Sequence, residues 1–434
     1  MSDVTPSPAA VEEIKQPERP KLIEILGPGL ITGASDDDPS GIATYSQVGA
    51  QFGYAIGWTL LITYPLMCAI QQISAEIGRV TGYGLAGNLR RYYPVAVLHG
   101  LVGLLVIANT INIGADLGAM GAALKLLVDG PALLYVGLFA VITVVLEIFV
   151  RYSRYVSVLK WLTLSLFAYV ATVFVVHVPW GAVGIGLVWP HLSMSGTYLT
   201  AVVAVFGTTI SPYLFFWQAE EEVEEQQEST GMEPLREAPG QSVRALSRIR
   251  LDTYIGMAFS NIVALSIVVT AAATLHANGH TDIQTSAQAA EALRPIAGRF
   301  AFTIFALGII GTGLLALPVL AGSAAYAVGE ALQWPVGLAR QPLRAKAFYG
   351  AIAAATTIGM VLNFTPIDPI KALFWSAVIN GVVAVPVMAM MMVMAVRTKV
   401  MGQFTLSQPL RIMGWLATAV MAAAAVGMFA TWGD

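Results

Sequence analysis

SDDDPSGIATYSQVGAQFGY, residues 35–54, lies in the first strongly hydrophobic segment of the chain and sets three acids beside a proline. Proline has no N–H to donate and its ring clashes with the preceding turn, so a helix must break at Pro39. In a bilayer, broken backbone survives only where protein or a watery cavity satisfies the freed groups. An intramembrane acid at such a break is by default a functional site. The stretch is typical of a transporter, with Asp38 in position to bind a cation.

The composition predicts an all-α polytopic membrane protein. Of 434 residues, 56% are hydrophobic and only 11% are charged, with a mean hydropathy of +0.70, whereas soluble domains carry about 25% charged residues. We therefore expect a lipid bilayer around the chain. We expect no nucleic acid, no obligatory protein partner and no cofactor.

Eleven stretches are long enough to span a bilayer, which takes about 20 residues. Before them, residues 1–21 are polar and predict a flexible cytoplasmic tail, followed by one transmembrane domain over 22–434. The expected spans are 22–52 (broken), 55–79, 97–126, 132–150, 156–178, 196–220 (broken), 252–275, 300–333, 346–363, 369–396 and 409–431.

The distribution of Lys and Arg predicts the orientation, because cytoplasmic loops are enriched in both. With the N-terminus inside, 19 of the 23 basic residues fall on the cytoplasmic side and four fall outside. An odd number of spans then places the C-terminus outside, in what we expect to be the plasma (inner) membrane. The four outer residues are Lys125, Arg294, Arg299 and Lys371.

A second break is expected in the sixth span, AVVAVFGTTISPYLFFWQAEEEVEE (201–225), where Thr208 and Thr209 precede Ser211-Pro212. Breaks five helices apart indicate two inverted five-helix repeats with a site at the membrane midplane. The repeats would cover about 22–178 and 196–396, with an extra helix at 409–431. Pro65 and Pro318 are expected to be ordinary proline kinks, which membrane helices tolerate.

The two breaks resemble those of a known family. DPSGIATYSQVGAQFGY (38–54) is similar to the first-helix signature of the Nramp divalent-metal transporters, DPGNIATDIQAGAQFGY. GTTISPYLFFWQ (207–218) occupies the place of that family's sixth-helix stretch ending in Met-Pro-His, and ADLGA (115–119) matches in helix three. The resemblance implies a LeuT-like fold, alternating access and a divalent ion held between helices one and six.

The chain departs from the family pattern at several site positions. Asp38 matches the family's Asp, but Gly41 stands in place of its Asn. Thr208 corresponds to an alanine that offers a backbone carbonyl, Ser211 to the methionine ligand, and Tyr213 to the histidine after the proline.

These departures predict which ion is transported. A thioether favours softer ions, so its replacement by Ser211, together with Thr208 and Asp38, leaves an all-oxygen site. Gly41 is also expected to widen the space around the ion. Mg²⁺ prefers octahedral oxygen coordination and retains waters. The pattern resembles the Nramp-related magnesium transporters, which implies Mg²⁺ or Mn²⁺ as the transported ion.

The departures in helix three bear on proton coupling. Asp116 matches the Asp of the family's proton route, but the Glu one turn later is Ala119, and Gln218 replaces a second sixth-helix histidine. Asp116 either relays protons or hydrogen-bonds a neighbouring helix, and we favour the second interpretation. The hypothesis that follows is that proton coupling is weak or absent.

Other polar residues have secondary roles in this interpretation. Adjacent helical residues point about 100° apart, so Asp36 and Asp37 cannot face one ion together with Asp38 unless the backbone unwinds. They ligate through water, line the access path or act as capping residues. Asn380, in the tenth span, contributes to gating, to the second coordination shell or to interhelical hydrogen bonding. Thr209, Tyr213 and Gln218 are further candidates for gating or the second coordination shell.

The same residues bear on four alternative functions. An ordinary proton-coupled Mn²⁺/Fe²⁺ transporter of the Nramp type would differ from this prediction only in the transported ion and in the coupling to protons. An amino-acid transporter of the same fold is disfavoured because the triple acid repels a carboxylate. A non-transporting metal sensor is disfavoured because no sizeable soluble signalling domain is present. An aspartyl protease dyad of Asp38 and Asp116 needs intact facing helices, and we expect no enzyme.

Overall fold

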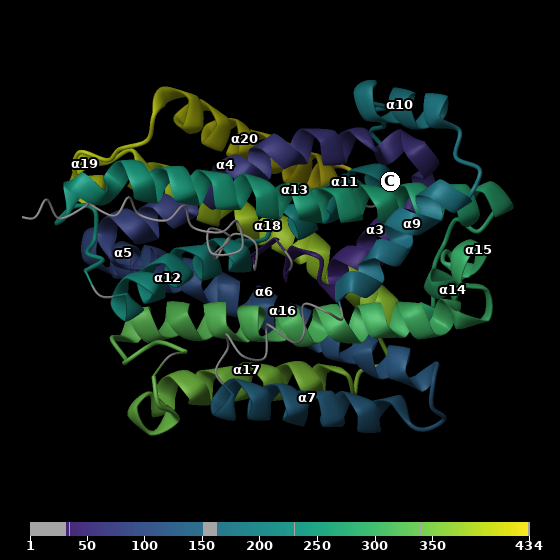
Figure 1. The fold of residues 1–434 in the computed structure, drawn as a ribbon, viewed down its shortest axis with the longest axis horizontal. Helices are drawn as coiled ribbons and strands as arrows, with labels where there is room; N and C mark the ends of the chain where they lie inside the picture. The colour runs from purple at the N-terminus through teal and green to yellow at the C-terminus, as the bar shows by residue number, and fades with distance from the viewer. Residues whose placement is uncertain (1–31, 34, 151–162, 230, 339, 433–434) are drawn as a thin grey trace, which may run out of the picture.

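The structure is a computed structural model that describes residues 32–33, 35–150, 163–229, 231–338 and 340–432. Within these residues, every regular element is a helix. The long helices lie side by side in one bundle (Figure 1). They are α4 (Trp58–Thr81), α6 (Val95–Lys125), α7 (Ala132–Phe149), α13 (Ser242–Thr274), α16 (Ala301–Leu332), α17 (Lys346–Leu362), α18 (Pro369–Ala395) and α20 (Gln408–Ala430).

Helices lie within each of the eleven predicted spans, and eight of these spans are confirmed in length and apolar character. Eight segments of the described residues are long and apolar enough to cross a bilayer. The other three expected spans contain α3 (Pro39–Phe52), α9 (Phe167–Val175) and α17, which is apolar but has 17 residues. Residues 22–31 and 34 of the first expected span and 156–162 of the fifth lie outside the described part of the chain, as does the expected tail over 1–21.

Both predicted breaks are confirmed. In the first span, α3 begins at Pro39 with Asp38 as its extended N-cap residue. In the sixth, α11 (Gly196–Thr209) ends before Ser211 and α12 (Pro212–Glu228) starts at the proline. Proline is well suited to a first helical position because its missing N–H would have no partner there. By contrast, Pro65 and Pro318 lie inside the continuous helices α4 and α16, as expected for kinks.

Small residues let the helices approach closely around the breaks. Gly207 of α11 meets Gly381 of α18, where an added Cβ would overlap the backbone of the partner helix. Gly78 of α4 lies against Ala219 of α12 in the same way. Without a hydrophobic driving force between helices in lipid, such contacts supply van der Waals packing. They hold the two halves of the sixth span against α18 and α4.

The loops rich in Arg meet at one end of the bundle. Arg236 donates from Nη1 to the Tyr92 hydroxyl at 2.9 Å and to the Val400 carbonyl at 3.1 Å. These contacts join the loop after α12 to α5 (Leu85–Tyr92) and α19 (Thr398–Met401). The short helices α10 (Trp180–Val188), α14 (Ser286–Glu291) and α15 (Arg294–Ala297) lie at the opposite end (Figure 1). The arrangement agrees with the predicted alternation of loops between two sides.

We expect Gly207→Ala to destabilise the fold, because its Cβ would overlap the carbonyl oxygen of Ala377 and overpacking typically costs about 1–3 kcal/mol. Gly137→Ala in α7 is the matched control, since no atom lies within 4 Å of the added Cβ. Thermal unfolding of both variants in detergent checks the expectation. Equal melting temperatures would contradict the close contact of α11 and α18.

Candidate functional site

Asp38 lies at the first break and caps α3. Its Oδ1 accepts hydrogen bonds from the Gly41 backbone N–H and the Ser40 hydroxyl, both at 2.7 Å. The residue is buried. An N-cap carboxylate satisfies backbone donors that would otherwise have no partner. The proline break therefore both creates the need for this carboxylate and fixes its position.

The second carboxylate oxygen of Asp38 connects three helices. Oδ2 accepts from Nδ2 of Asn112 on α6 at 3.1 Å and from the Tyr213 hydroxyl on α12 at 3.4 Å. The Tyr213 hydroxyl also lies 3.4 Å from the Ser35 carbonyl oxygen. The first break, the sixth-span break and α6 thus meet at one carboxylate.

Asp36 and Asp37 point to a different helix. Ser260 on α13 donates its hydroxyl to Asp36 Oδ2 at 2.6 Å and lies 3.2 Å from Asp37 Oδ1. The other oxygen of each carboxylate is buried without a hydrogen-bond partner among the described residues. Leaving such a group unsatisfied costs about 1–3 kcal/mol, and more when it is charged. Asp36 and Asp37 therefore flank the site without converging on Asp38.

Hydroxyl groups line the second break. Ser211 donates its hydroxyl to the Gly207 carbonyl at 2.7 Å and lies 3.1 Å from that of Thr208. A hydroxyl that donates its one proton keeps lone pairs that can bind a cation. Thr209 bonds back to the Val205 carbonyl at 2.9 Å within its own helix.

Gly41 has close neighbours at the place where a side chain would begin. A Cβ at this position would lie 3.2 Å from Thr208 Oγ1 and 3.4 Å from the Tyr45 ring. A side chain could begin here only if Thr208 moved by a few tenths of an ångström. The glycine instead allows α3 to approach α11, which brings the Thr208 hydroxyl close to the first break.

Two polar residues predicted for secondary roles, Gln218 and Asn380, are buried at different places. Gln218 on α12 accepts the hydroxyl of Thr32 at 2.5 Å, which links the sixth span to the residues before the first break. Asn380 on α18 has no hydrogen-bond partner for either amide atom among the described residues. The interhelical hydrogen bond that we considered for Asn380 is therefore not observed.

Asp116 also lacks the interhelical hydrogen bond that we favoured for it. The residue is fully buried on α6, and neither carboxylate oxygen has a hydrogen-bond partner in the described part of the chain. It lies one helical turn from Asn112, on the same face of α6. Asp116 thus adds a further buried acid from α6, one turn from the Asn112 side chain that contacts Asp38.

The arrangement is suited to a hard cation held by few protein ligands. The ion pairs seen among the described residues lie elsewhere, so no basic side chain there compensates the buried acids. A buried carboxylate needs a partner or a bound cation. Within the same residues, no three His, Cys, Asp or Glu side chains are grouped to hold a metal. The groups that contact Asp38 are two hydroxyls, the amide NH₂ of Asn112 and the backbone N–H of Gly41.

Two contributors were missed by the sequence analysis. Asn112 precedes Asp116 by four residues in NTINIGAD, a spacing that places both on one helical face. That spacing could have been noticed. Ser260 has no comparable signal, because a serine in a long apolar helix usually bonds to its own backbone.

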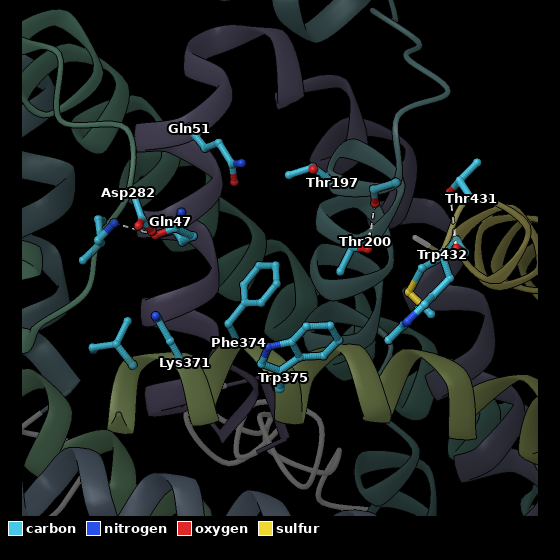
Figure 2. Close-up of a pocket in the computed structure, with 14 residues that line it drawn as sticks. Gln47, Gln51, Thr197, Thr200, Asp282, Lys371, Phe374, Trp375, Thr431 and Trp432 are labelled. Atoms are coloured by element: carbon cyan, nitrogen blue, oxygen red, sulfur yellow. Dashed lines mark hydrogen bonds between the residues drawn. The ribbon is translucent and has the colours of Figure 1, made fainter. Parts of the chain in front are cut away.

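A cavity of about 560 Å³ is lined by residues of α3, α11, α18 and α20 and of the loop before α14, and it shares α3 and α11 with the site. Figure 2 shows Phe374 and Trp375 of α18 between Gln47 and Asp282 on one side and Thr200 on the other. Gln47 belongs to α3, which begins at the Asp38 break, and Thr200 belongs to α11, which ends at Thr209. We refer to this space as the outer cavity.

The family model described as natural resistance-associated macrophage protein-like, Nramp, matches residues 29–431. The chain belongs to the Nramp family. The divalent metal cation transporter MntH of Klebsiella pneumoniae (strain 342) is 26% identical to this Nramp chain over 408 residues, which cover 92% of each protein. MntH of Aeromonas hydrophila is 28% identical over 360 residues, covering 81% of this chain and 83% of that protein.

Solved structures confirm the fold of this Nramp-family chain. A manganese transporter from Eremococcus coleocola, crystallised with an aromatic bis-isothiourea compound, matches with a TM-score of 0.71 at 17% identity, covering 94% of this chain and 88% of that one. Mhp1, a nucleobase-cation-symport-1 family transporter, matches with a TM-score of 0.57 at 13% identity, covering 94% and 93%. The fold is LeuT-like, with two inverted five-helix repeats and broken first and sixth helices.

We expect Ser260→Ala to lower the stability of the protein by about 1–3 kcal/mol, because it removes the hydroxyl shared by two buried carboxylates. Ser266→Ala on the same helix is the matched control, since Ser266 bonds only to the Ile262 carbonyl one turn earlier. Thermal unfolding without divalent ions measures both. If Ser260→Ala lost no more stability than Ser266→Ala, the burial of Asp36 and Asp37 would not depend on the Ser260 hydroxyl.

Proposed function

We propose that this chain transports the divalent cations Mg²⁺ and Mn²⁺ by alternating access, with the ion held between the breaks of the first and sixth spans. The observation that carries the proposal is the Asp38 carboxylate, which is buried at the first break and contacted from α6 and α12. Family membership supports it, as do relatives named divalent metal cation transporters. As a transporter, the chain would perform no enzymatic chemistry.

The choice of ion rests on the atoms near Asp38. The groups that contact its carboxylate are hydroxyls, an amide and a backbone N–H. The proposed ligands are Asp38, Ser211 and Thr208, with Gly41 allowing Thr208 to approach and with Asp36 and Asp37 acting from the α13 side. Oxygen ligands suit Mg²⁺ and Mn²⁺. A site with few carboxylates leaves room in the coordination sphere for the waters that Mg²⁺ retains.

Weak or absent proton coupling is the second part of the proposal. It rests on Ala119, which removes the acid one turn after Asp116, and on Gln218, which holds Thr32 where the family has a histidine. A transporter of this kind would be driven by the membrane potential, which favours inward movement of two charges by about 4.6 kcal/mol per 100 mV. Asp116 would then be a polar neighbour of the site and not a proton relay.

The proposed setting is the plasma (inner) membrane, with the Arg-rich end of the bundle in the cytoplasm. The N-terminus would lie inside and the C-terminus outside. The outer cavity would then open to the exterior and provide the access path to the ion site. Lys371 and Asp282 both line this cavity, so the lining of the outer cavity is not uniformly acidic, and selectivity would arise deeper, at the breaks.

Influx of Mg²⁺ and Mn²⁺ into proteoliposomes that contain the purified protein tests the ion site. We expect both ions to enter, and Asp38→Asn to reduce influx by about 100-fold, because it removes the charge that compensates the ion, an effect of about 2.7 kcal/mol. Asp129→Asn, in an exposed loop, is the matched control and should leave influx unchanged. Entry of Mn²⁺ without entry or competition by Mg²⁺ would refute the magnesium assignment.

A pH gradient tests the coupling. At zero membrane potential, coupling to one proton would let an inward gradient of one pH unit concentrate the ion about tenfold, equivalent to 1.36 kcal/mol. We expect no accumulation of Mn²⁺ above the external concentration and no acidification of the lumen during influx. A metal-dependent lumenal acidification would instead favour an ordinary proton-coupled Nramp transporter.

A further inference from the structure

Asn112 is a buried residue on α6 whose side chain faces the proposed ion site. Its Nδ2 lies 3.1 Å from Asp38 Oδ2. Its Oδ1 has no hydrogen-bond partner among the described residues, although the side chain is fully buried. A buried amide oxygen without a partner is uncommon in proteins. Its position beside an ion-binding carboxylate suggests that its partner is the hydrated ion.

The orientation of this amide follows from chemistry. An ionised carboxylate only accepts hydrogen bonds, so the NH₂ group must face Asp38 and the amide oxygen must face away from it. The Tyr213 hydroxyl approaches the same carboxylate oxygen from α12 at 3.4 Å. Asp38 Oδ2 is therefore held by two donors from two helices, and the amide oxygen remains available as an acceptor.

We propose that Asn112 belongs to the ion-binding site, a proposal that rests on the divalent-cation transport proposed above. Its NH₂ group positions the Asp38 carboxylate, and its oxygen accepts a hydrogen bond from a water molecule of the hydrated ion. Water bound to a divalent cation is a strong donor and Oδ1 is a pure acceptor, so the two are complementary. Gly41 on α3 stands where the family has an asparagine, and Asn112 on α6 would supply a side-chain amide in its place.

A purely structural role is the competing explanation, and Asn109 shows what such a role looks like. One turn earlier on α6, Asn109 donates to the Leu320 carbonyl at 2.8 Å and to the Ser323 hydroxyl at 2.9 Å on α16. The amide oxygens of both asparagines lack partners among the described residues. What separates the two residues is the contact of Asn112 with Asp38. Asn109 is therefore the matched control.

The test compares Asn112→Ala, Asn112→Ser and Asn109→Ala in the full-length protein. The KM values for Mg²⁺ and Mn²⁺ influx are measured in proteoliposomes, and thermal unfolding is measured without divalent ions. We expect both Asn112 variants to raise the two KM values by about tenfold, equivalent to 1.4 kcal/mol, with a larger increase for the more strongly hydrated Mg²⁺. Asn109→Ala should leave the ratio of the KM for Mg²⁺ to the KM for Mn²⁺ unchanged.

The outcomes separate the hypotheses. Unchanged KM values in both Asn112 variants would overturn the assignment of Asn112. Equal losses of stability and affinity in the Asn112 and Asn109 variants, with no change in the ion ratio, would also overturn it by showing a structural role. If the wild-type protein moves neither ion, the proposed function itself fails, whatever the variants do. Asn112→Ser keeps a polar group in the site, so the test stands if Asn112→Ala does not fold.

Discussion

The burial of an acid at a helix break is the constraint on which the rest of this structure depends. Pro39 and Pro212 both begin helices in the middle of membrane spans, and each break leaves backbone groups that need partners. Asp38 satisfies donors at the first break and simultaneously receives bonds from α6 and α12. The interior offers this carboxylate no basic partner in the described residues, and a buried carboxylate is costly unless it is paired, protonated or bound to a cation.

The sequence predicted those features that depend on local chemistry. The breaks at Pro39 and Pro212 were predicted correctly, and Pro65 and Pro318 lie inside continuous helices, so neither breaks its span. The features that were missed depend on which helices become neighbours. No local signal shows that Ser260 will meet Asp36, since the two residues are 224 positions apart.

The same limit applies to two other residues. A glycine in place of asparagine suggests a gap when only one helix is considered, yet Thr208 Oγ1 of another helix would lie only 3.2 Å from a Cβ at Gly41. The acid on α6 was expected to bond to a neighbouring helix, but both oxygens of Asp116 lack a hydrogen-bond partner among the described residues. In both cases, residue type alone was a poor guide, because the environment is set by packing between distant segments.

The glycine contacts around the sixth span have a consequence for motion. Gly207 allows α11 to pack closely against α18. The other half of the span, α12, packs against α4 at Gly78 and accepts a hydrogen bond from the Ser74 hydroxyl at the Phe215 carbonyl. The two halves of one span are thus packed against different helices, and the short extended segment around Ser211 joins them. A hinge of a few residues at an element boundary can absorb a large change of backbone angles. Rocking α4 with α12 against α11 with α18 would therefore open and close the proposed ligand set at its centre, without disturbing either glycine contact.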